Sequence, residues 1–318
     1  MTIPASFLDL FVNATEKAAY GASKFIGKGD KIAADKGAVD PLRNELNKID
    51  MYGTVVIGEG EMDEAPMLYI GEQLGTLTGP KFDIAVDPLE GTKFTANNEP
   101  NAFSVLVVAE KGNLLSAPDT YMEKIAIGSN LPNNLLDLDN SVEKNIKLLA
   151  EAKNKKISDL KACVLKRSRH NQIVESLTKM NVEINYITDG DIAGVLTVIG
   201  ENPTNDIYYS TGGGPEGVIA AAALSCYGGQ MQGRLILNKD EVKRAKNMGI
   251  TDIKKKYNID DMVKGDVIFC ASGVTSGDLA DGIKDIGDKY EVTTFVLHKS
   301  EKINKKIKNS YKKWIHCQ

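Results

Sequence analysis

The chain of 318 residues is 42% hydrophobic and 26% charged, with a net charge of −4, a composition typical of globular proteins without a nucleic-acid-binding surface. Its apolar runs are too short to span a bilayer, no signal peptide is evident, and four scattered cysteines suit neither a disulfide scaffold nor a zinc cluster. We therefore expect a cytoplasmic protein of one large or two packed domains, which binds neither nucleic acid nor membrane.

The first half of the chain, residues 1–150, is predicted to be an α+β half. Phe7, Phe11 and further apolar residues recur at helical spacing near the N-terminus, and later runs are apolar and β-like. A polar connection follows the last of these runs and precedes another helix. The expected helices are 4–26, 38–48, 65–74 (starting near Pro66) and 144–153, the expected strands are 53–57, 82–87 and 102–109, and the connection is 129–142.

The second half, residues 151–318, is predicted to be an α/β layered half, because strand and helix signals alternate along it. The boundary between the halves is placed near 140–155. The lysine-rich stretch from Lys299 to Lys313 is interpreted as a solvated helix. The expected strands are 162–165, 182–187, 206–209, 231–237, 266–271 and 292–297, and the expected helices are 171–180, 191–199 and 215–226.

Acidic residues crowd together directly after the expected strand 53–57. Glu59 and Glu61 are two residues apart, so in extended backbone both side chains point to the same side. Carboxylates crowded in this way repel one another unless a cation lies among them, which indicates a metal site. A nearby acid such as Asp63 is equally well explained as the cap of a helix beginning near Pro66.

The motif Asp-Pro-Leu-Glu-Gly-Thr begins at Asp87, at the end of the next expected strand. Pro88 is expected to end the hydrogen bonding of that strand, and Gly91 and Thr92 to open a turn or helix whose free N–H groups favour an anion. Asp87 and Glu90 offer carboxylate oxygens, the ligands that Mg²⁺ and Mn²⁺ prefer. Either acidic motif alone could be solvated, but both together behind two strands favour a metal site of the kind used in phosphoryl transfer.

Three further motifs carry groups suited to anions or sugar hydroxyls. Residues 211–217, Thr-Gly-Gly-Gly-Pro-Glu-Gly, lie at a strand-to-helix turn that could cradle a phosphate, and Glu216 beside it implies a cation. Residues 167–170, Arg-Ser-Arg-His, could bind a second phosphate, although such an arginine pair is more often surface charge. Residues 189–191, Asp-Gly-Asp, could accept sugar hydroxyls, although a turn and a helix cap explain them equally well.

These motifs together resemble those of a known family. DPLEGT at 87–92 resembles the metal motif of the lithium-sensitive, inositol-monophosphatase-like phosphatases. From about residue 28 to 235, the chain closely resembles the class II fructose-1,6-bisphosphatases, which implies a layered αβαβα sugar-phosphatase fold. The motifs that carry this resemblance are GDKIAAD (29–35), VVIGEGEMDEAPMLYIGE (55–72), FDIAVDPLEGT (82–92), APDTYMEK (117–124) and TGGGPEGV (211–218).

The resemblance implies roles for individual residues, including Asp35, which local sequence alone presents as a helix cap. Thr92 would orient the attacking water with the help of an acid such as Asp63 or Glu61. The implied ligands of Mg²⁺ or Mn²⁺ are Asp35, Glu59, Asp87, Glu90 and Glu216. The implied catalytic residues are Glu61, Thr92 and Asp63, and the implied substrate contacts are Glu90, Gly91, Thr92, Tyr121, Arg167, Ser168, Arg169, Asp189, Gly190, Asp191 and Gly213.

The activity that the resemblance implies is hydrolysis of the 1-phosphate of fructose-1,6-bisphosphate in gluconeogenesis, with sedoheptulose-1,7-bisphosphate as a second substrate in some members. The implied partner is a small sugar bisphosphate, and the implied assembly is a homo-oligomer, often a tetramer. Two alternatives stay open: another lithium-sensitive sugar or polyol phosphatase, or a non-catalytic module that binds a metal or a phosphorylated metabolite. Glu61 and Thr92 argue against the non-catalytic module, since binding alone requires neither.

Overall fold

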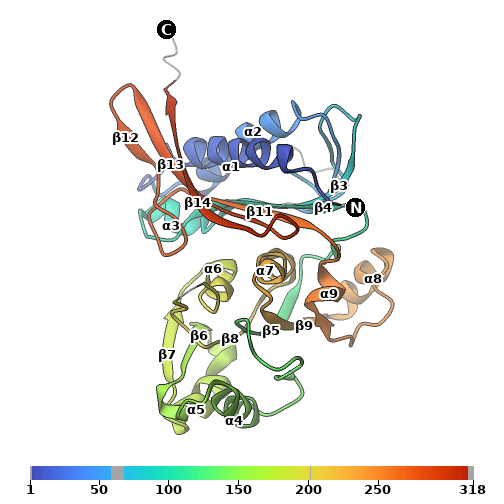
Figure 1. The fold of residues 1–318 in the computed structure, drawn as a ribbon, viewed down its shortest axis with the longest axis vertical. Coiled ribbons are helices and arrows are strands. Elements are labelled where there is room, and N and C mark those ends of the chain that lie inside the picture. Colours follow the sequence, from blue (N-terminus) through green and yellow to red (C-terminus); the bar gives the residue numbers. More distant parts are fainter. Residues whose placement is uncertain (1, 59–67, 201, 314–318) are drawn as a thin grey trace. The chain divides into compact units, whose positions relative to one another are not determined.

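The chain forms two compact units, each built on its own sheet (Figure 1). The structure is a computed structural model, and it describes residues 2–58, 68–200 and 202–313. The first unit contains residues 1–114 and 265–318, and the second contains residues 115–264. The units differ from the predicted halves 1–150 and 151–318, because the C-terminal segment returns to the first sheet. Both units combine helices with sheets, which confirms the predicted α/β class.

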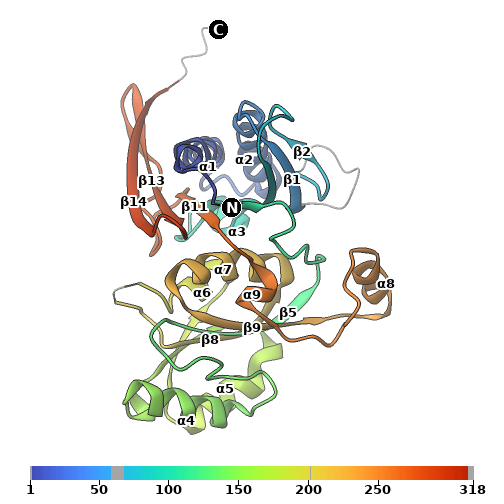
Figure 2. The ribbon, with the colours of Figure 1, turned by 45° about the vertical axis from the view of Figure 1, so that its right-hand side comes forward.

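The first unit is a mixed sheet whose long helices α1 and α2 lie across one face (Figures 1 and 2). Its strands lie in the order β12-β13-β11-β4-β3-β1-β2, and β14 also pairs with β13. Phe11 of α1 packs edge-on against Phe82 of β3 at the centre of the core. The elements are η1 Ala5–Phe7, α1 Leu8–Ser23, α2 Lys31–Leu46, β1 Tyr52–Ile57, β2 Gln73–Leu74, β3 Lys81–Glu90, α3 Thr92–Asn97, β4 Phe103–Glu110, β11 Val267–Gly273, β12 Lys284–Ile286, β13 Lys289–His298 and β14 Ile303–Lys312.

The two strands that precede the acidic motifs are parallel neighbours. β1 pairs with β3 along its length, ending with Ile57 opposite Ala85, so the carboxyl ends of both strands lie at the same edge of the sheet. The strand β3 continues through Pro88 to Glu90, beyond the predicted end at residue 87, although its pairing with β4 is interrupted at the proline as predicted. Proline is tolerated here because the register against β4 shifts after Asp87, which interrupts the hydrogen-bonded ladder.

Helix α2 begins earlier than predicted. It spans Lys31–Leu46 instead of 38–48, because Asp30 caps its N-terminus by accepting a hydrogen bond from the N–H of Ala33 at 2.9 Å. Asp35, which local sequence presents as a helix cap, therefore lies in the second turn of the helix.

Part of the segment predicted as a helix over 65–74 forms a turn and a short strand instead. Within the described portion, 68–74, strand β2 pairs antiparallel with β1. Arg43 of α2 holds this stretch through two hydrogen bonds to the carboxylate of Glu72, from Nε to Oε1 at 2.6 Å and from Nη2 to Oε2 at 3.1 Å. These tertiary contacts override the local helical pattern.

The lysine-rich stretch predicted as a solvated helix is a β-strand. β14 pairs antiparallel with β13 along its length. Ile303, Ile307 and Tyr311 are four residues apart, a spacing that places them on one face of a helix and equally on one face of a strand. In the structure they pack against the core of the first unit, while the lysines of the strand are exposed.

Buried Glu16 of α1 ties the β13–β14 hairpin to the helix. Its carboxylate accepts hydrogen bonds from Thr294 Oγ1 at 2.9 Å, from Asn309 Nδ2 at 3.1 Å and from the hydroxyl of Tyr311. Burial raises the pKa of Glu16 above its ordinary value, and these hydrogen bonds oppose that rise. The last strand of the chain is therefore fixed by a side chain near its beginning.

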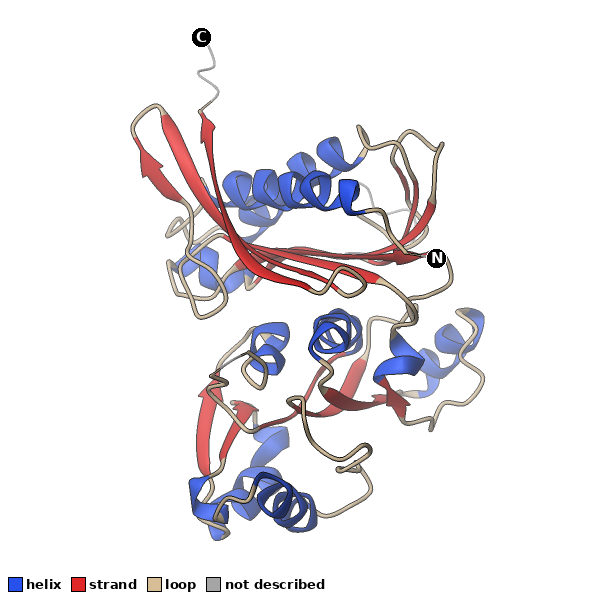
Figure 3. Ribbon diagram, in the orientation of Figure 1, coloured by secondary structure: helices blue, strands red, loops and turns tan. Residues whose placement is uncertain are grey.

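The second unit is a mixed sheet with helices on both faces (Figure 3). The strand order is β10-β9-β5-β8-β6-β7, and α6 and α7 lie on the face opposite to α4 and α5 (Figures 1 and 2). The predicted strand–helix alternation is confirmed, whereas strand β5 was not predicted. The elements are β5 Tyr121–Ile127, α4 Val142–Lys153, η2 Ile157–Asp159, β6 Lys161–Leu165, η3 Ser168–His170, α5 Asn171–Lys179, β7 Glu183–Ile187, α6 Asp191–Leu196, β8 Ile207–Gly213, α7 Gly214–Tyr227, β9 Gln230–Ile236, α8 Lys239–Asn247, β10 Tyr257–Asn258 and α9 Ile259–Met262.

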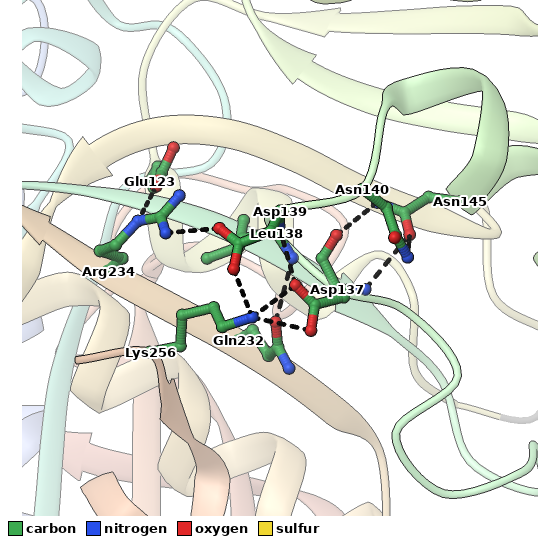
Figure 4. Close-up of polar contacts among 9 residues, drawn as sticks. All are labelled: Glu123, Asp137, Leu138, Asp139, Asn140, Asn145, Gln232, Arg234 and Lys256. Carbon is green, nitrogen blue, oxygen red and sulfur yellow. Dashed lines mark hydrogen bonds and ion pairs between the residues drawn. The ribbon is translucent and has the colours of Figure 1, made fainter. Parts of the chain in front are cut away.

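A network of charged side chains holds the polar connection, residues 128–141, against strands β9 and β10 (Figure 4). Lys256 Nζ lies 2.6 Å from Asp137 Oδ1 and 2.7 Å from Asp139 Oδ2, and Arg234 Nη1 lies 2.6 Å from Asp139 Oδ1. The hydrogen bonds from Lys256 lower the pKa of both carboxyl groups. The predicted connection is thus confirmed as a long loop with defined anchors.

Replacing Tyr311 by phenylalanine is expected to lower the stability of the first unit. The change removes one donor from a buried carboxylate, which costs about 1–3 kcal/mol of unfolding free energy. Urea unfolding followed by circular dichroism measures the effect, with Tyr186→Phe, at an exposed tyrosine of β7, as the control. Equal midpoints for Tyr311→Phe and the control would contradict the role given to Glu16.

Candidate functional site

Asp87 and Glu90 lie at the carboxyl end of β3 in the first unit. Asp87 is half-buried, and its Oδ1 accepts a hydrogen bond from the N–H of Leu89 at 3.0 Å, which holds the carboxylate beside the irregularity at Pro88. Glu90 is 7% exposed and lies opposite Phe103 of β4. Two carboxylates at one strand end offer oxygen ligands of the kind that a hard divalent cation binds.

Gly91 turns the chain from β3 into helix α3. Its φ of +81° is in the left-handed region, and a Cβ there would lie 2.7 Å from the ring of Phe94, so glycine is required. Thr92 is half-buried and is the first residue of α3. The predicted opening of a helix at these two residues is confirmed, and it places the Thr92 side chain at the end of the acidic strand.

Asp35 is carried by a segment that packs beside α3. The N–H of Gly27 donates to the carbonyl of Thr95, and the N–H of Gly29 donates to the carbonyl of Ala96, both at 2.9 Å. Helix α2 follows this loop directly. The start of α2 is therefore held next to the helix that follows the acidic strand.

Glu59, Glu61 and Asp63, three of the predicted site residues, lie outside the described residues. The described residues that flank them are Gly58 and Leu68, which are in contact: a Cβ on Gly58 would lie 2.1 Å from the carbonyl oxygen of Leu68. Gly58 and Leu68 therefore meet at the carboxyl end of β1, which lies beside β3.

The acidic residues of the first unit are the kind of donors that a hard divalent cation requires. Asp35, Asp87 and Glu90 offer carboxylate oxygens from a helix and a neighbouring strand end. Within the described part of the chain, no three His, Cys, Asp or Glu side chains lie close enough together to hold an ion. Glu59 is not described and Glu216 belongs to the second unit, so the complete ligand set stays a prediction.

Arg169 and Tyr121 form a preorganised pair in the second unit. Nε and Nη2 of Arg169 donate to the carbonyl oxygen of Thr211 at 3.0 and 2.7 Å. The guanidinium group lies 4.7 Å from the centre of the Tyr121 ring, which is itself 54% exposed. This arginine is exposed and is held over the Tyr121 ring near the end of β8, a suitable position for binding a phosphate.

Arg167 and Asp189 lie together because the strands that precede them are parallel. Leu165 of β6 is opposite Ile187 of β7, so the two following loops start side by side. Arg167 Nη2 lies 3.9 Å from Asp189 Oδ1, and both side chains are partly exposed. Gly190, with a φ of +79°, then turns the chain into α6. The structure therefore brings two predicted substrate motifs to one edge of the second sheet.

His170, which ends the predicted basic motif 167–170, has a structural role that sequence reasoning missed. It ends the short turn η3 (Ser168–His170), its Nδ1 lies 2.7 Å from the carbonyl oxygen of Leu165, and its Nε2 accepts the N–H of Thr211 at 2.8 Å. Because a backbone N–H can only donate, the ring proton resides on Nδ1. Burial lowers the pKa of His170, which keeps the ring neutral. The available signal was a single histidine directly after the Arg-Ser-Arg motif.

Asp191 is held by two residues that sequence reasoning also missed. It is 8% exposed, its Oδ1 accepts a hydrogen bond from the hydroxyl of Tyr208, and its Oδ2 pairs with the ammonium group of Lys124. The side chain of Lys124 is fully buried. A lysine within an apolar strand, between Met122 and Ile125, was the available signal.

Gly213 and Glu216 form the turn between β8 and α7. The carbonyl oxygen of Gly213 accepts a hydrogen bond from Lys124 Nζ at 2.5 Å. The carboxylate of Glu216 folds back over Gly213, since a Cβ on this glycine would lie 1.8 Å from Glu216 Oε2. Pro215 lies in the first turn of α7, as predicted. Any side chain at residue 213 would displace the Glu216 carboxylate.

Comparisons of the whole sequence identify close relatives. A family model described as bacterial fructose-1,6-bisphosphatase, glpX-encoded, matches residues 6–311. The fructose-1,6-bisphosphatase 1 class 2 of Escherichia coli (strain K12) is 39% identical over 314 residues, covering 94% of this chain and 93% of that protein. A Trichodesmium erythraeum protein named D-fructose 1,6-bisphosphatase class 2/sedoheptulose 1,7-bisphosphatase is 36% identical, covering 92% of each chain. These matches extend over both compact units.

Two solved structures resemble the chain more distantly. An inositol monophosphatase from Anabaena (Nostoc) sp. PCC 7120 has a TM-score of 0.39 and 15% identity, covering 71% of this chain and 83% of that one. The extragenic suppressor protein suhB from Bartonella henselae has a TM-score of 0.38 and 12% identity, covering 65% and 77%. Of the helices described here, none has the length and apolar character to span a membrane.

The pH dependence of stability is expected to include a contribution from His170. Because its pKa is lower in the folded protein than the ordinary 6.5, the unfolded chain takes up a proton first as the pH falls. The contribution of His170 to the free energy of unfolding is thus complete above pH 6.5. It declines as the pH falls from 6.5 towards the lowered pKa of the folded protein. Thermal unfolding of wild type and His170→Gln across this range measures the contribution, and parallel pH profiles would contradict it.

Proposed function

The chain belongs to the family of bacterial, glpX-encoded fructose-1,6-bisphosphatases, and on this premise we propose that it hydrolyses the 1-phosphate of fructose-1,6-bisphosphate to fructose-6-phosphate and phosphate. The observation that carries the proposal is 36–39% identity to class 2 enzymes over more than nine-tenths of the chain. The chain is accordingly a phosphatase, and its place in metabolism is gluconeogenesis. The name of the Trichodesmium relative also supports sedoheptulose-1,7-bisphosphate as a second substrate.

The second unit supplies groups for the phosphate that is not cleaved. Arg169 already binds Thr211 through Nε and Nη2, so holding its guanidinium group against a phosphate would cost little further entropy. Arg167 adds a second guanidinium group, and Tyr121 supports the first. Binding the remote phosphate in this way would orient the sugar for reaction at its other end.

The first unit supplies the acidic groups for the phosphate that is cleaved. Phosphatases of this family generally depend on a metal, and we propose Mg²⁺ or Mn²⁺ held by the five predicted ligands Asp35, Glu59, Asp87, Glu90 and Glu216. When bound, the ions would polarise the phosphoryl oxygens and lower the pKa of a water molecule. Thr92 would orient the attacking water by accepting or donating a hydrogen bond, and Glu61 or Asp63 would accept its proton.

The remaining contacts of the proposed site bind the sugar. Glu90, Gly91 and Thr92 would contact the reacting end, and Ser168, Asp189, Gly190, Asp191 and Gly213 would contact the rest of the substrate. A sugar bisphosphate is therefore the proposed small-molecule partner. The homo-oligomeric assembly, the tetramer in particular, and the cytoplasm as its place of action stay proposals that rest on the family.

Removal of divalent metal is expected to abolish activity. Purified protein dialysed against a chelator should release no phosphate from fructose-1,6-bisphosphate, and added Mn²⁺ or Mg²⁺ should restore release, because the carboxylates alone repel the substrate. Phosphate release measured across a metal titration tests this and ranks the two ions. Full activity in excess chelator would refute the proposed chemistry.

Replacing Arg169 by alanine is expected to raise KM while leaving kcat nearly unchanged. The lost interaction with a phosphate is a hydrogen bond to a charged group, about 1.5–3 kcal/mol, or roughly 10- to 100-fold in KM. Arg244→Ala is the matched control, because this arginine of α8 donates to the carbonyl of Asp119 and its removal changes the net charge equally. A fall in kcat with unchanged KM would show that Arg169 serves the reaction centre instead.

A further inference from the structure

Lys124 is a buried lysine to which no functional role is assigned. It lies on β5 with a side chain that is 0% exposed, and it pairs with Asp191 at the start of α6. Its ammonium group also donates to the carbonyl oxygen of Gly213 at 2.5 Å. One side chain therefore joins two segments that are predicted to contact the substrate, the Asp-Gly-Asp turn and the turn into α7.

The carboxylate of Asp191 is held from two sides. Lys124 binds Oδ2, and the hydroxyl of Tyr208 donates to Oδ1. Tyr208 is fully buried, and burial together with the charge of Asp191 raises its pKa well above the usual value, so the hydroxyl stays a donor. Asp191 cannot rotate without breaking one of these bonds, and each of its oxygens keeps a lone pair for a further donor.

Glycines make room for this cluster, which we name the Lys124 cluster (Lys124, Asp191 and Tyr208). A Cβ on Gly212 would lie 2.2 Å from Asp191 Oδ2, so no side chain fits beside the carboxylate. A Cβ on Gly217 of α7 would lie 2.8 Å from the sulfur of Met122 and 3.2 Å from Lys124 Cδ. The backbone on both sides is therefore shaped around the cluster.

Stability alone is a weak explanation for the Lys124 cluster. Apolar residues of similar volume often stabilise a core as well as a buried ion pair does, because taking charges out of water is costly. A second lysine–aspartate pair, Lys153 with Asp206, lies directly before the start of β8 and has a partly exposed lysine. Of these two lysine–aspartate pairs, Lys124 with Asp191 is the one that contacts the predicted substrate segments.

We propose that Lys124 is a positioning residue for sugar binding, which locks Asp191 and the carbonyl of Gly213 into one arrangement before the substrate arrives. This inference rests on the proposed function. With two donors already bound, Asp191 presents only acceptor lone pairs, so it selects ligands that carry hydroxyl groups at this position. A phosphate ester without a sugar would gain nothing from the cluster.

The experiment compares Lys124→Met, an unbranched neutral replacement, with Lys153→Met as the matched control. Each full-length variant is assayed with metal on fructose-1,6-bisphosphate and on p-nitrophenyl phosphate, which has no sugar. Lys124→Met should raise KM for the bisphosphate on the order of 10- to 100-fold and leave p-nitrophenyl phosphate hydrolysis within about twofold. Lys153→Met should leave both substrates unchanged. Equal losses on both substrates, or an unchanged KM, would overturn the inference.

A double-mutant cycle separates positioning from an independent contribution. If Lys124 acts through Asp191, then Lys124→Met combined with Asp191→Asn should raise KM no further than Asp191→Asn alone. Additive increases would refute the proposal. Tyr208→Phe removes the other donor to Asp191. It should raise KM for the bisphosphate by a smaller factor, and it should likewise add nothing to Asp191→Asn. This variant tests the proposal if Lys124→Met does not fold.

Failure of the inference is distinguishable from failure of the proposed function. Wild-type protein that releases phosphate from p-nitrophenyl phosphate but from no sugar bisphosphate would refute the proposed function, and the inference with it. Wild-type protein that hydrolyses fructose-1,6-bisphosphate, together with a folded Lys124→Met variant of the same KM, would refute the inference alone.

Discussion

The positions of Arg169 and His170 in the second unit depend on the point where strand β6 separates from strand β8. The two strands pair only as far as Cys163 opposite Tyr208, so the backbone groups of β8 beyond that point need other partners. His170 accepts the N–H of Thr211, and Arg169 donates to the carbonyl oxygen of the same residue. These two side chains thus bond to β8 where β6 no longer pairs with it. One of them, Arg169, also presents its guanidinium group at this end of the sheet. The need to give these backbone groups hydrogen-bond partners therefore also fixes the position of the arginine that we propose to bind phosphate.

Buried charge makes this arrangement rigid. Lys124 and Asp191 are both withdrawn from water, and breaking such a pair by removing one partner typically costs about 3–5 kcal/mol. The pair adds little net stability relative to an apolar core, but it strongly penalises every conformation in which the two groups separate. The same reasoning applies in the first unit to Glu16, whose hydrogen bonds to Thr294 and Tyr311 bind the last hairpin to the first helix.

In the first unit, strand pairing and loop contacts fix the described segments that carry or precede the acidic motifs. Parallel pairing places the ends of β1 and β3 at one edge, and hydrogen bonds to α3 hold the loop before α2 beside them. Gly91 lets the chain pass from the strand that ends at Glu90 into the helix that begins with Thr92. Carboxylates from separate segments can then serve one cation, which is the physical basis of the proposed chemistry.

The strands that precede the acidic motifs, the glycine turns and the family could all be predicted before folding is considered, because these depend on local patterns of apolar, proline and glycine residues. Tertiary structure decided the rest. Ile303, Ile307 and Tyr311 suit a helix and a strand equally, and only pairing with β13 selects the strand. Arg43 holds Glu72 in a turn where a helix was expected. Lys124 meets Asp191 across 67 residues of sequence, and no local pattern records a contact between side chains that only folding brings together.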